Sequence, residues 1–196
     1  DVGTTKICTL VGRVEEKALH IIGVGIEPSE GIKKGVIIDL SSASDAISRS
    51  VKKAEKTSAV EITGALVSLA GAHVSSINSR GVAGISGDAI DDIDVERAMD
   101  AARAVAIPHN REIIHIVPRG FTVDGQAGIS TPIGMYGYRL EVETHIITAA
   151  QATVQNLREA VNSAGVDVLH FILNPLASGE VVLSDAEREM GVVVCD

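Results

Sequence analysis

The residues best suited to chemistry stand at the start of the chain, in the segment Asp1-Val-Gly-Thr-Thr-Lys6. This segment leads straight into an apolar run, which predicts a tight turn between two strands. Gly3 tolerates a positive φ and lets the backbone come close to a ligand. Thr4, Thr5 and Lys6 offer hydroxyls, amide N–H groups and one cation to an anion such as a nucleotide phosphate. The alternative is an ordinary hairpin turn that uses Gly and Thr for their turn chemistry.

Two aspartates offer carboxylates to a metal ion. Asp1 begins the turn, and Asp196 follows the apolar run 192–195. That run predicts a buried strand, because it lacks the polar face of a surface helix. A carboxylate in such a place is suited to a hydrated magnesium ion. We therefore expect the two aspartates to lie at neighbouring strand ends and to face one groove.

Both ends of the sequence predict that the chain is an excerpt of a longer protein. A turn at residues 1–6 requires a strand before it, and the run 192–195 is followed by only one residue. The preceding strand, together with the β-branched runs 7–14 and 19–26, would form a three-stranded meander.

Composition excludes several classes of protein. The 196 residues are 45% hydrophobic but only 2% aromatic, which predicts an aliphatic core with few rings for base stacking. A net charge of -9 argues against nonspecific nucleic-acid binding and against a polybasic membrane patch. No apolar run approaches the roughly 20 residues of a membrane-spanning helix. The widely separated Cys8 and Cys195 predict buried thiols without a disulfide, which fits the cytoplasm.

Strand and helix patterns alternate at both ends of the chain and differ in the middle. The outer pattern comprises strands at 7–14, 19–26 and 61–70, a helix from Asp39 or Ser41 to about Ala59, a helix at 150–164, a strand at 166–173, a short helix from Asn174-Pro175 and a final strand. The middle pattern comprises a strand at 74–86 that a turn or bulge breaks near residues 78–81, a helix at 91–106 and strands at 112–123 and 139–148. We interpret the middle part as a subdomain inserted into an α/β core.

Several motifs together resemble one family. They are Asp1-Val-Gly-Thr-Thr-Lys6, Gly31-Ile-Lys-Lys-Gly-Val-Ile-Ile-Asp39, Ala70-Gly-Ala-His-Val-Ser-Ser-Ile-Asn-Ser-Arg-Gly81, Arg111-Glu-Ile-Ile-His115, Phe121-Thr-Val-Asp-Gly125 and Asn174-Pro-Leu-Ala-Ser178. Over its whole length the chain resembles the FtsA family of bacterial cell-division proteins, within the superfamily of actin, chaperones and sugar kinases. The first motif is shared widely in that superfamily, and the Asn-Ser-Arg-Gly segment is the specific one.

The resemblance implies an α/β fold of the actin-like, ribonuclease H-like kind. Residues 1–71 and 149–190 would form a discontinuous subdomain 1A, and residues 72–148 would form an inserted α+β strand-helix-strand-strand subdomain, called 1C. Residues 191–196 would be the first strand of a truncated subdomain 2A.

The resemblance also implies ATP and Mg²⁺ as ligands. Gly3, Thr4, Thr5 and Lys6 would form the first phosphate loop, and Asp1 and Asp196 would face the magnesium ion and its waters. Asn174 stands where chaperone relatives place a glutamate that orients the attacking water. Since an amide cannot act as a carboxylate base, we expect at most slow ATP hydrolysis, and none in the fragment alone.

For partners, the resemblance implies an adaptor that polymerises and links FtsZ filaments to the inner face of the cell membrane at the division septum. The FtsZ site and the membrane-anchoring C-terminal helix would lie outside this sequence. The inserted subdomain, residues 72–148, would serve self-association and contact with later division proteins such as FtsN.

Three alternatives remain open at this point. An actin-like scaffold of type IV pilus assembly carries a similar inserted subdomain. A small-molecule kinase of the same superfamily shares the Asp-x-Gly-Thr-Thr segment, although residues 72–149 contain no candidate for its catalytic aspartate. A pure interaction module would bind no nucleotide.

Overall fold

The computed structural model describes residues 1–16, 18–87 and 89–195. The chain folds into two compact units: one joins Asp1–His73 to the segment that starts at Gln151, and the other is Val74–Ala150. In the described part, no helix combines the length and the apolar character that a membrane crossing needs.

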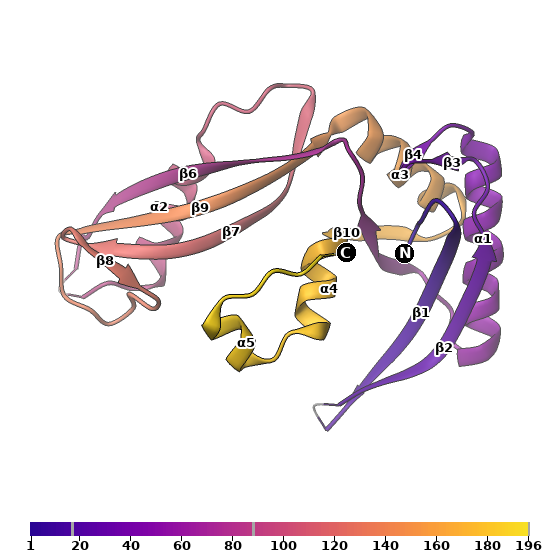
Figure 1. Ribbon diagram of the computed structural model, residues 1–196, viewed down its shortest axis with the longest axis horizontal. Coiled ribbons are helices and arrows are strands. Elements are labelled where there is room, and N and C mark those ends of the chain that lie inside the picture. The colour runs from indigo at the N-terminus through magenta and orange to yellow at the C-terminus, as the bar shows by residue number, and fades with distance from the viewer. Residues whose placement is uncertain (17, 88, 196) are drawn as a thin grey trace. The chain divides into compact units, whose positions relative to one another are not determined.

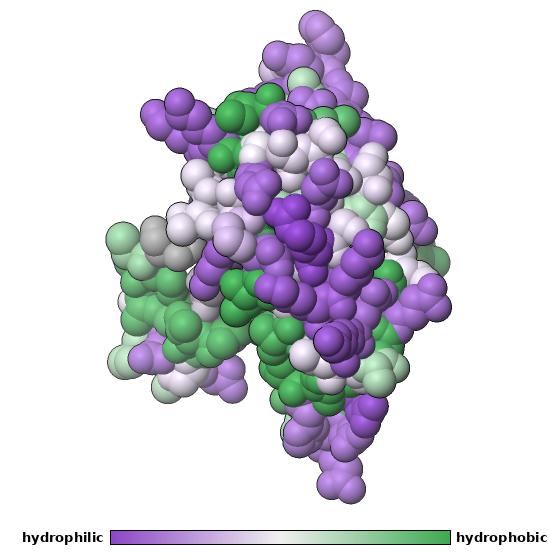
Figure 2. All heavy atoms as spheres, turned by 90° about the vertical axis from the view of Figure 1, so that its right-hand side faces the viewer, coloured by the Kyte–Doolittle hydropathy of each residue, from purple (hydrophilic) through white to green (hydrophobic). Residues whose placement is uncertain are grey.

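The first unit begins with a long hairpin that one helix covers. Strands β1 (Lys6–Glu15) and β2 (Ala18–Pro28) pair antiparallel, and helix α1 (Leu40–Ser58) lies along them (Figure 1). The carboxylate of Asp39 caps this helix by accepting hydrogen bonds from the amides of Ser41 and Ser42. The outer side of α1 carries exposed charged residues, and Figure 2 shows this side of the molecule as largely hydrophilic. The helix expected in this region is confirmed.

A parallel pair of strands completes the first unit. Strands β5 (Gly64–Leu69) and β10 (Asp167–Leu173) pair in parallel, and their last residues are register partners. Helix α3 (Gln151–Ser163) precedes β10 and buries its apolar face, and helix α4 (Asn174–Val182) follows β10 without a break.

The remaining elements of the first unit are the two-residue strands β3 (Ile32–Lys33) and β4 (Val36–Ile37), which form a small hairpin, and helix α5 (Asp185–Met190).

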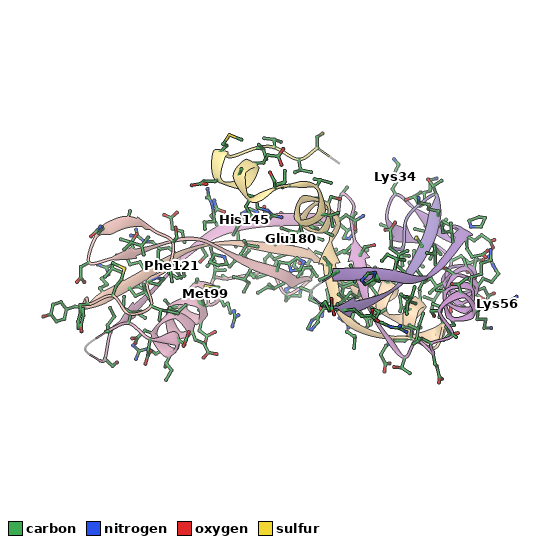
Figure 3. All side chains as sticks on the ribbon, turned by 90° about the horizontal axis from the view of Figure 1, so that it is seen from below. Lys34, Lys56, Met99, Phe121, His145 and Glu180 are labelled. Atoms are coloured by element: carbon green, nitrogen blue, oxygen red, sulfur yellow. The ribbon has the colours of Figure 1, made fainter. Side chains whose placement is uncertain are left out.

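The second unit is a four-stranded antiparallel sheet with one helix. The strand order is β6-β9-β7-β8, with β6 at Val74–Gly84, β9 at Arg139–Ala150, β7 at Arg111–Val123 and β8 at Gln126–Ile129. Helix α2 (Asp92–Arg103) packs on this sheet. Met99 of α2 and Phe121 of β7 lie at the same apolar cluster, which is centred on buried residues such as Leu140 and Val142 (Figure 3).

The expected break in the strand at 74–86 is wrong. All eleven residues of β6 pair with β9 without a register shift. Gly81 has a different role from a turn: a Cβ on it would lie 1.9 Å from the carbonyl oxygen of Ala98. The glycine therefore lets α2 approach the strand closely, and a sequence pattern cannot distinguish that role from a bend.

The expected strand at 192–195 is also wrong. These residues have no regular secondary structure, and Val193 is 93% exposed. An apolar run becomes a buried strand only beside a partner strand, and none pairs with it in the part of the chain that the structure describes. Cys195 is exposed and Cys8 is half-buried, so the expected burial of both thiols is wrong as well, although both cysteines are free as expected. Strand β8 and helix α5 were not predicted from the sequence.

Candidate functional site

A polar pocket of the first unit lies where the parallel strands β5 and β10 end. Its lining comes from four segments that are distant in sequence: Asp1–Thr4, Lys34 and Gly35, Ser68 with 70–72, and Asn174. In sheets of parallel strands, ligands bind outside the carboxyl ends of the strands. The location therefore fits a ligand site.

Asp1 is held at the edge of this pocket by two strands. Its amino group donates a 2.7 Å hydrogen bond to the carbonyl of Cys8, and the amide of Cys8 donates a 2.9 Å bond to the carbonyl of Asp1. Its carboxylate oxygen Oδ1 accepts a 2.7 Å hydrogen bond from the hydroxyl of Ser68 on β5. The backbone and the side chain of Asp1 are thus tied to β1 and to β5.

The turn that follows Asp1 is closed by a hydrogen bond between two of its own residues. The amide of Gly3 donates a 3.1 Å hydrogen bond to the carbonyl of Lys6. A Cβ on Gly3 would lie 2.9 Å from that carbonyl oxygen, so the turn has little room for a side chain there. The hydroxyl of Thr4 accepts a 3.2 Å hydrogen bond from the amide of Gly35, which joins the turn to the β3–β4 hairpin. Gly35 itself has a φ of 74°, a backbone conformation that favours glycine.

Asn174 supplies a buried polar atom that has no partner. Its side-chain oxygen Oδ1 is buried and forms no hydrogen bond within the described residues. Native proteins seldom leave such an atom unpaired, so an unpaired one that lines a pocket points to a missing ligand or water. Asn174 is also the first residue of α4, and the amino end of a helix attracts anions.

The other expected site residues lie elsewhere or outside the described residues. Thr5 and Lys6 are exposed and do not line the pocket. Asp196 lies outside the described residues, so the expected pairing of the two aspartates stays a prediction. The structure brings together Asp1, Gly3, Thr4 and Asn174 of the expected set.

Several residues that line the pocket were not predicted from the sequence as site residues. Ser68, Gly35 and residues 70–72 line it together with the expected residues. The only signal for Gly35 was the glycine pair that brackets residues 31–35, a pattern of turns in general. Ser68 carried no signal, since a serine in an apolar strand is common and its partner is 67 positions away.

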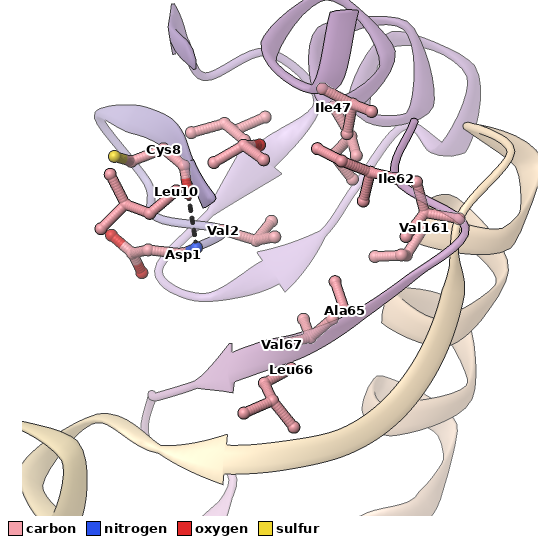
Figure 4. Close-up of a pocket in the computed structure, with 14 residues that line it drawn as sticks. Asp1, Val2, Cys8, Leu10, Ile47, Ile62, Ala65, Leu66, Val67 and Val161 are labelled. Carbon is pink, nitrogen blue, oxygen red and sulfur yellow. Dashed lines mark hydrogen bonds between the residues drawn. The ribbon is translucent and has the colours of Figure 1, made fainter. Parts of the chain in front are cut away.

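A second hollow in the same unit is apolar. It lies between β1 and β5 and is lined mostly by aliphatic side chains, including Leu10, Ile47, Leu66 and Val161 (Figure 4). Asp1 at its rim is the only charged residue of its lining. It therefore offers little to a charged ligand, and the polar pocket is the better candidate for chemistry.

The polar pocket fits a phosphate with magnesium. The amide of Thr4, which no hydrogen bond of the turn uses, and the amino end of α4 suit phosphate oxygens, and the Asp1 carboxylate suits a metal ion. The described residues contain no group of three or more His, Cys, Asp or Glu side chains that could hold a metal. Magnesium is commonly bound through one or two carboxylates, waters and substrate phosphates, which the Asp1 carboxylate alone can join.

Residues 71–148 match the family described as the SHS2 domain inserted in FtsA. These residues coincide closely with the compact unit Val74–Ala150.

Curated relatives match the whole chain. It is 47% identical to the cell division protein FtsA of Borreliella burgdorferi, 38% identical to that of Pseudomonas aeruginosa and 36% identical to that of Bacillus subtilis. Each match covers 100% of this chain but only 48%, 47% and 45% of the respective relative. The chain thus spans about half the length of the curated relatives it matches.

A solved structure supports the fold class independently. One chain of the solved PilM-PilN type IV pilus biogenesis complex superposes on this chain with a TM-score of 0.60 at 14% sequence identity. The match covers 91% of this chain and 47% of the chain in the complex. At that identity the likeness concerns the fold alone, and it agrees with the expected actin-like α/β fold with an inserted α+β subdomain. By sequence, the chain is therefore similar to the FtsA proteins over about half of their length, and its residues 71–148 match the SHS2 domain inserted in FtsA.

Proposed function

We propose that the polar pocket binds the phosphates of ATP together with a magnesium ion. The observation that carries this proposal is the convergence of Asp1, Gly3, Thr4 and Asn174 in one pocket at the ends of two parallel strands. The unpaired Oδ1 of Asn174 supports a polar ligand there. The bound ion would neutralise phosphate charge, while the Asp1 carboxylate would hold its waters and the Thr4 amide and the amino end of α4 would hold phosphate oxygens.

Hydrolysis at this site would be slow. Asn174 is the residue of the pocket at the position expected to orient an attacking water, and its amide cannot take a proton from that water. ATP would then act chiefly by setting conformation and assembly state. A turnover number on the order of 1 per second or more for a full-length relative of this sequence would contradict this part of the proposal.

In the cell, the protein would act in division. Its curated relatives are named cell division protein FtsA. We infer an adaptor that polymerises, links FtsZ filaments to the inner face of the cell membrane at the septum, and contacts later division proteins such as FtsN through the inserted unit Val74–Ala150. The regions for FtsZ and for the membrane would belong to the half of the relatives that this chain does not span.

Two alternatives are less well supported. The pilus scaffold shares the fold, but its 14% identity is far below the 34–47% identity of the FtsA relatives. A small-molecule kinase of the same superfamily requires a catalytic aspartate in a sugar pocket, and none of the residues that line the polar pocket besides Asp1 is an aspartate.

Titration of the 196-residue chain with ATP and magnesium tests the site. The amide signals of Gly3, Thr4 and 70–72 should shift in nuclear magnetic resonance spectra, with a dissociation constant on the order of 1 mM or weaker because the chain spans about half the length of its relatives. Thr4→Val should weaken binding, since it removes the hydroxyl that Gly35 contacts. The exposed Thr131 of the second unit provides the control, Thr131→Val. Shifts scattered over both units, or equal binding by Thr4→Val and the parent chain, would contradict the proposal and favour a pure interaction module.

A further inference from the structure

We propose that Ser68 is a positioning residue that orients the carboxylate of Asp1 toward the magnesium ion. The inference rests on the proposed ATP site and adds to it a residue outside the phosphate turn. Ser68 is half-buried near the end of β5 and lines the polar pocket.

The hydroxyl of Ser68 has its direction set by two partners. It donates a 2.7 Å hydrogen bond to Oδ1 of Asp1 and accepts a 3.2 Å hydrogen bond from the amide of Val2. A serine hydroxyl has a single donor, so the bond to Asp1 uses all of its donor capacity. The amide of Val2 favours the rotamer in which the proton points at Asp1, because it occupies an acceptor lone pair of the oxygen.

The two oxygens of the Asp1 carboxylate differ in their hydrogen bonding. Oδ1 is held by Ser68, whereas Oδ2 accepts no hydrogen bond within the part of the chain that the structure describes. A Cβ on Gly3 would lie 3.7 Å from Oδ2, so the glycine keeps the space beside this oxygen open. Oδ2 is therefore the oxygen that can face an ion or its waters.

Orientation matters more for magnesium than for most ions. Mg²⁺ requires a nearly ideal octahedron of oxygen ligands, and a carboxylate that rotates freely meets this geometry only part of the time. Partners that fix a metal-binding side chain typically change metal affinity by about 10- to 100-fold when they are removed. Ser68 would exert this effect on Asp1 without touching the ion.

The competing explanation is a structural one, in which Ser68 only fastens the first residues of the chain to β5. The two roles differ in what they affect. A loosened turn would weaken ATP binding with and without metal, whereas a misdirected carboxylate would reduce only the part of the affinity that depends on metal.

The experiment measures two dissociation constants for each variant, one for ATP in the presence of a chelator and one for the complex of Mn²⁺ with ATP. Mn²⁺ replaces Mg²⁺ because it also broadens nearby amide signals, and the broadening of Thr4 at equal saturation reports how the ion is held. The variants are Ser68→Ala, Ser68→Thr, which keeps the hydroxyl, and the control Ser76→Ala at an exposed serine of β6.

We expect Ser68→Ala to leave metal-free ATP binding within about twofold, to lower the metal-dependent gain in affinity by about tenfold or more, and to weaken the broadening of Thr4. Ser68→Thr and Ser76→Ala should behave as the parent chain. An unchanged gain in Ser68→Ala would overturn the inference and leave the ATP site standing. Equal losses with and without metal would also overturn it, in favour of the structural role. If the parent chain binds neither form of ATP, the proposed function fails and the inference fails with it.

Discussion

Gly81 lies directly against the backbone of Ala98, so closely that a Cβ on the glycine would be 1.9 Å from the Ala98 carbonyl oxygen. The contact holds helix α2 on strand β6 above the apolar cluster of the second unit. A glycine at this position is thus a requirement of packing, and its backbone φ is not in the left-handed region.

Gly81→Ala should destabilise the second unit by about 3 kcal/mol or more, because backbone atoms of α2 must move to admit the methyl group. The control is Gly84→Ala at the end of the same strand, where an added Cβ would meet nothing within 4 Å. Urea unfolding followed by circular dichroism measures both. Similar unfolding midpoints for the two variants would show that α2 does not approach the strand as described.

Asn174→Leu should weaken ATP binding without lowering the stability of the chain. Because Oδ1 of Asn174 has no partner within the described residues, removing this oxygen breaks no hydrogen bond with them. The unfolding free energy should therefore change by less than about 1 kcal/mol, or rise, while the ATP-induced amide shifts diminish. A large loss of stability would instead indicate that the amide serves the fold.

The stability of the first unit should depend on pH through Glu27. This buried carboxylate forms ion pairs with Lys53 and Arg49 of α1, and the hydrogen bond from Lys53 holds its pKa below the ordinary value of 4.5. A carboxyl with a lowered native pKa binds protons more readily in the unfolded chain. Its contribution is present above pH 4.5 and is lost as the pH falls through the native value.

Urea midpoints measured from neutral pH to about pH 3 should therefore fall less steeply in Glu27→Gln than in the parent chain, because the variant has already lost the contribution at neutral pH. Glu61→Gln, at an exposed position, serves as the control and should follow the parent chain. Parallel curves for the parent chain and Glu27→Gln would contradict the assignment.

A buried carboxylate in the second unit gives a further test. Glu141 of β9 is 5% exposed and forms ion pairs with Arg80 and Arg139, the latter at 3.1 Å. Arg80→Ala should lower the unfolding free energy by about 1 kcal/mol, since hydrogen bonds to charged groups are strong but the guanidinium is half-exposed. Arg119→Ala on β7, an exposed arginine, should stay within about 0.5 kcal/mol of the parent chain. Equal effects in the two variants would contradict the special role of the Glu141 pair.

The strand-helix order was predictable because local patterns decide it. The apolar spacing of the first helix and the capping side chain of Asp39 both lie within a few residues of the backbone that they stabilise. The break near Gly81 and the strand at 192–195 were predicted wrongly for the opposite reason. Whether a glycine bends a strand or admits a helix, and whether an apolar run finds a partner strand, depends on elements far away in the sequence.

For the candidate site, the sequence by itself determined the turn at residues 1–6 and the start of a helix at Asn174, because a glycine-containing turn before a strand and the first residue after a strand are local features. Only the tertiary structure decided that these residues share one pocket with Ser68 and Gly35. The bond between Ser68 and Asp1 spans 67 positions, and the bond between Gly35 and Thr4 spans 31. Such contacts arise from the pairing of β5 with β10 and the closure of the β3–β4 hairpin, which no pattern of neighbouring residues encodes.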